Sequence, residues 1–464
     1  MPVVLGVDSS VHSTRVELRD ADTGRVVSEG VAAHPPPAGP RREQDPQAWW
    51  QALLDARRQT GSPIVAAVAV AAQQHGLVAL DEDHRIVRPA LVGDDVESAL
   101  DAKWLVEQLD GPRAWVDRCG TVPNAALTVS KLSWLHRSEP DHFARTARVL
   151  LPHDWLTARI VGRFVTDRGD ASGTGYWSPK ENRYLPEVLA LVDSERDWGR
   201  SFPKVLDPSE PAGEREGSIA APGTGASMAA ALGLGLRPGD VAVMIGDTGM
   251  VCAVSNRATK DDSGAVAGFA DATGRFLPQV HVRNTVEVTD AVARLLNVDR
   301  AGLDQLALAS EPGAGGVVLV PYFDGARTPD EAEATGALTG LRSDVTPEQV
   351  ARAAVEGVVC SLLEGVDAIA AQGVPVDGRF VLFGAAARSH AYQQVLADLA
   401  QRPVEVPRGE HVVLGACVQA AAVLQSRPPQ DVAAAWELGG GRVVEPEPDI
   451  DVDGIRARYT ARRG

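Results

Sequence analysis

Residues 3–15 read VVLGVDSSVHSTR, and this stretch decides the fold that the chain is expected to adopt. Its first part, Val3 to Asp8, is mostly apolar and typical of a buried strand, whereas Ser13 to Asp20 alternates charged and apolar residues as a half-buried strand does. Asp22-Thr23-Gly24 predicts a turn, and Arg25 to Val31 predicts a third strand. We therefore expect the chain to begin as an antiparallel meander.

A helix and a further strand should follow the meander. Asp45-Pro46 predicts a helix start, because aspartate is a good N-cap and proline fits the first helical position. Ile64 to Ala72 is a largely apolar run that predicts a buried strand. Strands and helices combined in this way favour a mixed sheet covered by helices.

A second unit of the same kind is expected after the Pro/Gly-rich stretch 208–225. Val241 to Val243 and Val251 to Val254 predict strands on either side of a turn at Gly246, which repeats the strand–turn–strand pattern around Asp8. This repetition indicates a duplicated fold. The other elements predicted here are a strand at Gly315 to Val320, a helix from the capping-box sequence Thr346-Pro347-Glu348-Gln349, a strand at Arg379 to Phe383 and a helix from about Ser389.

Length and composition indicate the class of protein. The 464 residues are too many for one ordinary core, so two α/β domains are predicted, residues 1–235 and 236–435. A polar, Gly/Pro-rich C-terminal tail at 436–464 should lie on the surface. Hydrophobic residues make up 44% and charged residues 23% of the chain, as in globular proteins.

Charge and cysteine usage disfavour several partners and locations. The formal net charge of −17 makes nucleic acid and anionic membranes unfavourable partners. No apolar run reaches the roughly 18 residues of a membrane span, and the start of the chain lacks the basic segment of a signal peptide. The four cysteines have neither disulfide-framework nor metal-ligand spacing, which favours a reducing cytoplasm; they are Cys119, Cys252, Cys360 and Cys417.

Several motifs occur in a familiar order along residues 3–425. They are Gln73-Gln74-His75-Gly76 with Leu77 to Asp81, Thr128 to Trp134 with Lys131, Leu151 to Leu156, Thr166 to Thr174, Arg327-Thr328-Pro329 and Gly336 to Gly357. Together they resemble the FGGY carbohydrate kinases, and most closely the xylulose kinases. The resemblance implies an α/β fold of two actin-like (ribonuclease H-like) domains with a central cleft, as in the sugar kinase/Hsp70/actin superfamily.

The resemblance also implies phosphoryl transfer from Mg-ATP to a sugar hydroxyl. In the family the sugar lies mainly on the N-terminal domain and the nucleotide mainly on the C-terminal one, so a small-molecule ligand is expected in the interdomain cleft. Two glycine- and threonine-containing hairpins hold the phosphates, because glycine lets backbone N–H groups approach them closely. An aspartate takes the proton of the attacking hydroxyl. Family members are often homodimers.

The first phosphate hairpin corresponds to residues 8–15 and departs from the family pattern. By resemblance, Asp8 serves the metal and belongs to the catalytic set. Val11 stands where the family has a threonine, so a hydroxyl donor is lost. The candidate nucleotide-binding residues of this hairpin are Ser10, His12 and Arg15, although a lone histidine in a loop is more often structural than catalytic.

The position of the catalytic base is also altered. The family's Gly-Thr-Gly-Asp-Asn-Ala-like segment reads Gly223-Thr224-Gly225-Ala226-Ser227 here, so alanine stands where the base is expected. Loss of a general base costs roughly 10²- to 10⁴-fold in rate, and Ser227 cannot replace it without an activator of its own. A second alignment makes Gly246-Asp247 the catalytic pair but requires a deletion, whereas residues 233–240 fit the family spacing without a gap.

The second phosphate hairpin, Gly246-Asp247-Thr248-Gly249, carries an aspartate within the family's Gly-Thr-Ser-Gly pattern. Two unit charges ~4 Å apart repel by about 4 kcal/mol at an effective dielectric of about 20, so Asp247 weighs against ATP unless a metal bridges them. Asp8 and Asp247 are therefore the candidate metal ligands and catalytic residues. The other candidate nucleotide-binding residues are Gly246, Thr248, Gly384, Ala385 and Gly415, where Ala385 replaces a glycine of the family's adenine-side loop.

The acceptor side differs too. The family's Trp-Asn-Asp-Thr-Arg segment reads Gly93-Asp94-Asp95-Val96-Glu97, which removes an aromatic wall and replaces an arginine by an acid. A larger and more acidic pocket would suit a larger or cationic molecule, although acidic loop residues are usually solvated surface. The candidate substrate-binding residues are Gln74, His75, Asp94, Asp95 and Glu97.

Three functional hypotheses remain open. The first is an ATP-dependent phosphotransferase with an altered acceptor, such as a non-sugar or an amine that depends less on a base. The second is a kinase-fold protein without phosphotransfer, acting as a pseudokinase, a binding protein or an enzyme for another reaction; the joint changes at Val11, Ala226, Asp247 and Ala385 favour it and weigh against Mg-ATP. The third is an ordinary xylulose kinase, which Ala226 disfavours. Fold alone does not decide among them.

Overall fold

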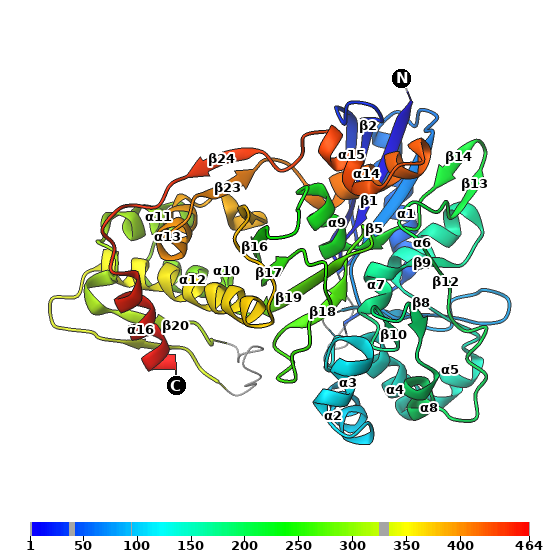
Figure 1. The fold of residues 1–464 in the computed structure, drawn as a ribbon, viewed down its shortest axis with the longest axis horizontal. Helices are drawn as coiled ribbons and strands as arrows, with labels where there is room; N and C mark the ends of the chain where they lie inside the picture. The colour runs from blue at the N-terminus through cyan, green and yellow to red at the C-terminus, as the bar shows by residue number, and fades with distance from the viewer. Residues whose placement is uncertain (1, 37–41, 94, 324–333, 464) are drawn as a thin grey trace. The chain divides into compact units, whose positions relative to one another are not determined.

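The computed structural model describes residues 2–36, 42–93, 95–323 and 334–463, which form two compact units (Figure 1). Unit 1 consists of Met1–Leu236, Asn256–Leu277 and Gly409–Gly439, and unit 2 consists of Arg237–Ser255, Pro278–Arg408 and Gly440–Gly464. Asp94 and the motif Arg327-Thr328-Pro329 lie outside the described residues. Within the described part of the chain, no helix is long and apolar enough to cross a membrane.

Unit 1 is built on a mixed sheet with the strand order β13-β14-β5-β1-β2-β3, and β15 also pairs with β5. The predicted meander supplies three of the seven strands of this sheet, β1, β2 and β3, and β1 pairs antiparallel with β2 and parallel with β5. The strands are β1 Val3–Ser9, β2 Ser13–Asp20, β3 Val26–Ala33, β5 Ala67–Ala72, β13 Gly213–Arg215, β14 Ser218–Ala220 and β15 Thr224–Gly225. Short strands outside it are β4 Glu43–Gln44, β6 Val78–Leu80, β7 Ala90–Leu91, β8 Arg148–Leu150, β9 Val165–Asp167, β10 Trp177–Ser178, β11 Arg183–Tyr184, β12 Lys204–Leu206 and β18 Ala267–Ala270.

The helices of unit 1 cover both faces of this sheet. α14 and α9 pack on β5, and α14 also packs on β1, whereas α1 lies against β2 and β3. The predicted helix start is confirmed, since the Asp45 side chain caps α1 by accepting from Gln47 N. The helices are α1 Pro46–Gln59, α2 Ala99–Gln108, α3 Pro112–Cys119, α4 Thr128–Ser138, α5 Pro140–Arg145, α6 Pro152–Val161, α7 Arg168–Ser172, α8 Pro186–Val192, α9 Ala226–Gly233, α14 His411–Gln425 and α15 Pro429–Ala435.

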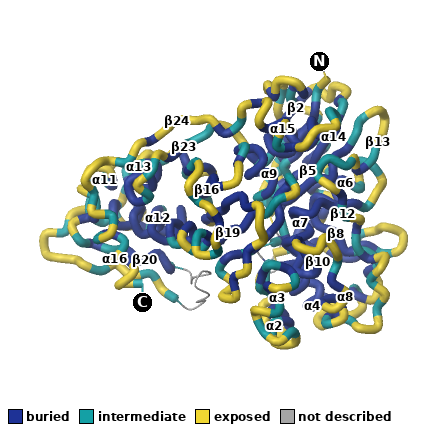
Figure 2. Tube along the Cα trace, viewed as in Figure 1, coloured by how far each residue is buried: buried dark blue, intermediate teal, exposed yellow. Residues whose placement is uncertain are grey.

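Strand β1 is mostly buried, and its neighbour β5, labelled in Figure 2, is dark blue there. Leu5 and Val7 belong to a core that also contains Trp49 of α1. Gly6 points the other way, because successive residues of a strand face opposite sides. A Cβ at Gly6 would stand 2.5 Å from Cys417 Sγ, so α14 approaches this face at backbone distance.

The contact between α9 and α14 is equally close. A Cβ at Gly415 would stand 1.9 Å from the carbonyl oxygen of Ala229, and one at Gly233 would stand 2.0 Å from that of His411. Such distances are far below ordinary van der Waals contact, so the two helices touch through their glycines. α9 is therefore packed directly on α14 at Ala229 and Gly233.

Unit 2 repeats the architecture with the strand order β19-β17-β16-β22-β23-β24. β16 pairs antiparallel with β17 and parallel with β22. The predicted capping box is confirmed at Thr346 and Gln349, where α12 begins. The elements are β16 Val241–Ile245, β17 Gly249–Ala253, β19 Phe276–Val282, α10 Val286–Leu295, α11 Arg300–Ala309, η1 Ala314–Gly316, β20 Val318–Val320, β21 Ala337–Thr339, α12 Pro347–Ala371, β22 Phe380–Phe383, η2 Ala385–Arg388, α13 His390–Ala400, β23 Val404–Pro407, β24 Gly441–Val444 and α16 Val452–Arg463.

The observed units differ from the predicted domains of 1–235 and 236–435. The segments Asn256–Leu277 and Gly409–Gly439 belong to unit 1, because α14 fills the face of its sheet that β1 and β5 leave open. The predicted surface tail at 436–464 is also more structured than expected. β24 pairs with β23, and α16 buries Ile455 and Tyr459.

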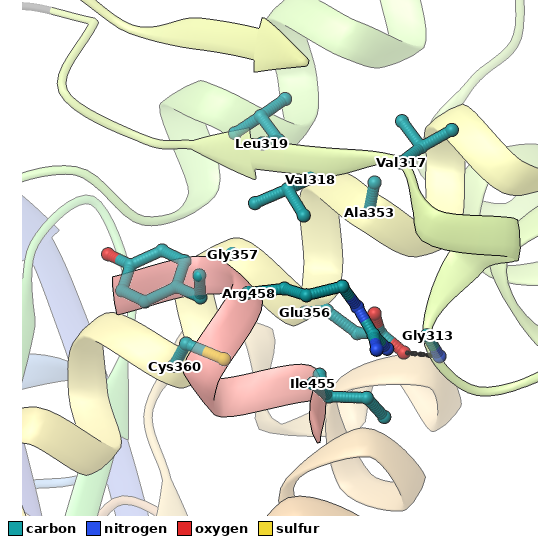
Figure 3. Close-up of a pocket in the computed structure, with 11 residues that line it drawn as sticks. Gly313, Val317, Val318, Leu319, Ala353, Glu356, Gly357, Cys360, Ile455 and Arg458 are labelled. Atoms are coloured by element: carbon teal, nitrogen blue, oxygen red, sulfur yellow. Dashed lines mark hydrogen bonds between the residues drawn. The ribbon is translucent and has the colours of Figure 1, made fainter. Parts of the chain in front are cut away.

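The packing of α16 leaves one small cavity, which Figure 3 shows between α16, α12 and β20. Its volume is about 10 Å³, room for about one water molecule. The Glu356 carboxylate points to its rim and accepts from Gly313 N at 2.8 Å. The cavity is too small for a metabolite.

Candidate functional site

The β1–β2 turn is the first candidate phosphate hairpin. Asp8 lies opposite Arg15 in the strand register. Ser10 Oγ accepts from the N–H groups of His12 and Ser13, each at 3.1 Å, and donates to Ser13 O at 3.0 Å. Two N–H groups at the turn are therefore already bonded within the turn.

Asp8 lies among other charged groups of unit 1. Burial raises the pKa of Asp8 to about 7; Glu410 adds to this rise, and Arg15 opposes it. Arg15 forms ion pairs with two glutamates: Nη1 lies 3.3 Å from Glu29 Oε2, and Nη2 lies 3.8 Å from Glu410 Oε1. Because a carboxyl with this pKa is about half protonated at neutral pH, a metal at Asp8 would have to displace a proton.

The junction between β15 and α9 carries the altered base position. Ala226 is the first residue of α9, and its side chain is a partly exposed methyl group. The next amide, Ser227 N, donates to Gln74 Oε1 at 3.1 Å. A Cβ at Gly225 would stand 2.8 Å from Asp170 Oδ1, so a carboxyl lies directly behind the junction.

That carboxyl belongs to a fully buried cluster of one histidine and three aspartates. His153 Nε2 lies 3.2 Å from Asp154 Oδ1 and 3.4 Å from Asp170 Oδ2. It lies 3.6 Å from Asp167 Oδ1. Thr224 Oγ1 donates to Asp167 Oδ2 at 2.7 Å, which ties β15 to the cluster.

Burial shifts the titration of the whole cluster. It raises the pKa of Asp167 to about 6 and lowers the pKa of His153 to about 3. The pKa values of Asp154 and Asp170 are raised well above the usual range, first by burial and then by the neighbouring carboxyls. The native cluster therefore holds protons that the unfolded chain releases near pH 4.

This cluster predicts a loss of stability as the pH rises. A raised pKa stabilises the fold fully below the unfolded value, here 3.8 for Asp167, and this contribution is lost as the pH rises through the folded value of about 6. The loss from Asp167 alone is roughly 3 kcal/mol, since each pKa unit corresponds to about 1.4 kcal/mol. His153 acts in the opposite direction, because its lowered pKa makes the fold more stable as the pH rises from about 3 to 6.5. Three carboxyls with raised pKa values oppose this one histidine, so we expect the denaturation midpoint of unit 1 to fall as the pH rises from 4 to 7.

The measurement is chemical denaturation across that pH range for the parent protein and for Asp170→Asn. This variant removes one carboxyl that the fold keeps protonated and the unfolded chain ionises, so its midpoint should fall less steeply with pH. Glu216→Gln, which removes a carboxylate whose side chain is 88% exposed, should behave as the parent does. A parallel pH profile for Asp170→Asn would contradict the assignment.

The acceptor-side residues of unit 1 are mostly engaged in holding its backbone. His75 is buried with φ +63°, and its Nδ1 lies 2.9 Å from Gly173 O. Asp95 is 2% exposed; its Oδ1 accepts from Glu97 N at 3.1 Å and its Oδ2 from Arg42 N at 3.3 Å. Both oxygens of Asp95 thus help to hold the surrounding loop, and substrate binding by Asp95 stays a prediction.

The backbone of the same loop leaves no room for the aromatic side chain of the family pattern. A Cβ at Gly93 would stand 2.5 Å from the carbonyl oxygen of Gln74. No larger side chain fits this position without a shift of the main chain. Gln74 itself remains partly exposed, with its side chain oriented by Ser227 N.

Unit 2 brings the candidate nucleotide-side residues together at one end of its sheet. Gly246 N donates to Thr248 O at 3.1 Å, which closes the β16–β17 turn, and Asp247 is exposed at its tip. Gly384 follows the parallel strand β22 with φ +102°, and a Cβ there would stand 2.6 Å from Ile245 O. The adjoining Ala385 is exposed.

Gly415, another candidate nucleotide-binding residue, lies in unit 1. It is buried in α14 of unit 1, where a Cβ would meet the backbone of α9. Glycine at this position serves helix packing, and its nucleotide-binding role stays a prediction.

The residues present fit bound Mg-ATP only in part. In the described ranges, no group of three or more His, Cys, Asp or Glu side chains is arranged to hold a metal ion. Val11 offers no hydroxyl, and two amides of the first turn are bonded to Ser10. Asp8 and Asp247 thus stay predictions as metal ligands and catalytic residues.

The buried cluster is the main feature that sequence reasoning missed. His153 and Asp154 lie in one recognised motif and Asp167 and Asp170 in another, yet no role was assigned to them. The available signal was the placement of charged residues within otherwise apolar or small-residue segments. Their convergence depends on the packing of α6 against the sheet and on β9 and α7.

Comparisons with known proteins agree with this architecture. Residues 3–231 match the N-terminal domain of the FGGY family of carbohydrate kinases, and residues 242–424 match its C-terminal domain. A xylulose kinase of Streptomyces rubiginosus is 43% identical over 456 residues, covering 96% of this chain and 92% of the relative. One of Haemophilus influenzae is 30% identical and covers 90% of each chain.

Solved structures of carbohydrate kinases are also similar to this chain. The crystal structure of xylulose kinase from Bifidobacterium adolescentis superposes with a TM-score of 0.90 at 35% identity, covering 100% of this chain and 99% of that one. Plasmodium falciparum glycerol kinase with ADP has a TM-score of 0.87 at 17% identity over 99% of this chain and 96% of that one, which shows the fold alone. This protein therefore belongs to the FGGY family of carbohydrate kinases.

Proposed function

We propose that this protein is an ATP-dependent phosphotransferase whose acceptor is an amine-bearing polyol and not a neutral ketose. The single observation that carries the proposal is Ala226 at the head of α9, where the family resemblance implies a carboxylate base. Without that base, transfer to a sugar hydroxyl of a neutral ketose should be slow. Family membership supports the phosphotransfer itself.

The acceptor-side backbone supports the altered substrate class. Gly93 leaves no room for an aromatic side chain, so the wall that would pack on a sugar ring is absent. Glu97 replaces an arginine of the family pattern and makes this loop more acidic. An acidic loop favours a cationic acceptor over a neutral one.

A second candidate function is ligand binding without phosphotransfer. It is favoured by the β1–β2 turn, where Ser10 Oγ occupies the N–H groups of His12 and Ser13. Those amides would otherwise be available to a phosphate. These occupied amides, together with Val11 and Asp247, weaken phosphate binding at both phosphate hairpins.

The deciding experiment is acceptor-dependent ADP formation with Mg-ATP. D-glucosamine and other amino sugars should release ADP at least tenfold faster than D-xylulose does. Turnover of D-xylulose at roughly 1 to 100 s⁻¹, a rate typical of kinases, would identify an ordinary xylulose kinase and overturn the proposal. If no acceptor leads to ADP release, ligand binding without phosphotransfer is the remaining candidate function.

Nucleotide affinity gives a separate prediction. Replacing Asp247 by threonine removes an exposed negative charge from the second phosphate hairpin, so Mg-ATP should bind about tenfold more tightly in calorimetric titration. Solvent screening keeps the gain well below the ~4 kcal/mol of the unscreened pair. Asp247→Asn should reproduce most of the gain, whereas weaker binding in both variants would indicate that Asp247 holds the metal.

A further inference from the structure

Unit 1 carries a groove of about 670 Å³ that none of the candidate site residues lines. It lies between the start of α1, the segment 84–89 and the C-terminal half of α6. Its volume falls within the range of sites that hold small molecules. Its polar lining comes mainly from Gln47, His84, Arg85, Arg88 and Arg159.

Arg159 is the positive group that this groove presents to a ligand. Its guanidinium stacks over the rings of Trp50 and Trp155, at 4.9 and 5.4 Å from their centroids. Nη1 donates to Gln47 Oε1 at 3.3 Å. Arg159 forms no salt bridge with any described residue, so most of its donors face solvent in a fixed orientation.

Arg85 is a second cation of the groove that can bind an anionic ligand. It pairs with Asp83 at 2.9 Å, but the two side chains are 74% and 66% exposed. Such surface pairs contribute little, so Arg85 can exchange its partner for a bound anion. His84, next to it, keeps its ring against Phe164 at 4.8 Å.

The acidic groups around the groove are already committed. Arg88 is among the lining residues and pairs with both Glu43 and Glu139. Asp45 stands at the rim, where its carboxylate accepts from Gln47 N as the N-cap of α1. Among the lining arginines, Arg159 is therefore the one that has no carboxylate partner among the described residues.

We propose that this groove is a binding site for a small phosphate-bearing molecule, held by Arg159 and Arg85. Planar guanidinium groups bind phosphate through paired N–H donors, and stacking on two indole rings fixes the plane of Arg159 before the ligand arrives. The chain as a whole is strongly acidic, so binding depends on these local cations. The site is independent of the reaction proposed above.

The test is calorimetric titration of the full chain with glycerol 3-phosphate at low salt. Saturable binding is expected, with no binding of glycerol and a steep weakening as salt increases. Arg159→Gln should weaken binding at least tenfold while leaving the thermal unfolding midpoint unchanged. Arg215→Gln, which removes an exposed arginine on β13 of the same unit, should bind as the parent does.

Two results would overturn the proposal. One is the absence of saturable binding by the parent protein. The other is equal affinity of the parent and of Arg159→Gln, which would mean that the phosphate ester binds elsewhere on the molecule. A double variant, Arg85→Gln with Arg159→Gln, should abolish binding if both guanidinium groups contribute.

Discussion

Replacing Ala226 by aspartate should raise the rate of phosphotransfer to D-xylulose by about 10²- to 10⁴-fold. The new carboxylate would stand at the first position of α9, where a helix N-terminus favours negative charge and keeps the group ionised. Because this position is partly exposed, the side chain needs no buried space. Acceptor-dependent ADP release at saturating Mg-ATP is the measurement.

Ala226→Asn is the matched control for this experiment. It has the size and polarity of the aspartate but cannot accept a proton, so its rate should remain that of the parent. A gain that is equal in both variants would show that shape at position 226, and not a base, limits the reaction. If the rate of ADP release rises in neither variant, the protein is blocked before the chemical step. A protein that does not bind the nucleotide would behave in this way.

Replacing Gly415 by alanine should destabilise unit 1 by about 3 kcal/mol or more, which is at the upper end for overpacking a tight contact. The added Cβ would stand 1.9 Å from the carbonyl oxygen of Ala229, so α9 and α14 would have to move apart. Denaturant unfolding followed by tryptophan fluorescence is the measurement.

Gly440→Ala serves as the control for the Gly415 variant. No heavy atom lies within 4 Å of the Cβ that it would add, so its unfolding midpoint should stay close to that of the parent. A stable Gly415→Ala protein would show that the two helices can separate at little cost. The rigid position of Ala226 at the head of α9 would then be in question.

Local signals in the sequence predicted the elements of the fold well. Alternation in residues 13–20 and the capping residues Asp45 and Thr346 correspond to the observed β2, α1 and α12. These signals depend on a few neighbouring residues, so the elements can be predicted without knowledge of tertiary contacts. The strand predicted at 315–320 was too long, because a 3-10 turn occupies its first part.

The division into units was harder to predict because it depends on distant contacts. The apolar residues of 411–425 indicate a buried helix, but nothing in them states which sheet the helix covers. Gly415 illustrates the problem. The sequence does not show that this glycine packs against the backbone of Ala229 in a distant helix.

The candidate site could be predicted in residue type but not in role. Asp95 and Asp170 are both aspartates in recognised motifs, yet one fixes a loop and the other belongs to a buried proton-holding cluster. The difference lies in what surrounds each carboxyl and how much water reaches it. Such surroundings are assembled from segments that are far apart in the chain.

The late return of α14 to unit 1 has a consequence for biosynthesis. A ribosome that has finished residue 236 must add about 200 more before Gly439 emerges, which takes roughly 10 to 40 s at ordinary elongation rates. During this time one apolar face of β1 and β5 lacks its covering helix. The nascent chain is therefore a natural client for chaperones, and unit 1 can complete its fold only after most of unit 2 has been synthesised.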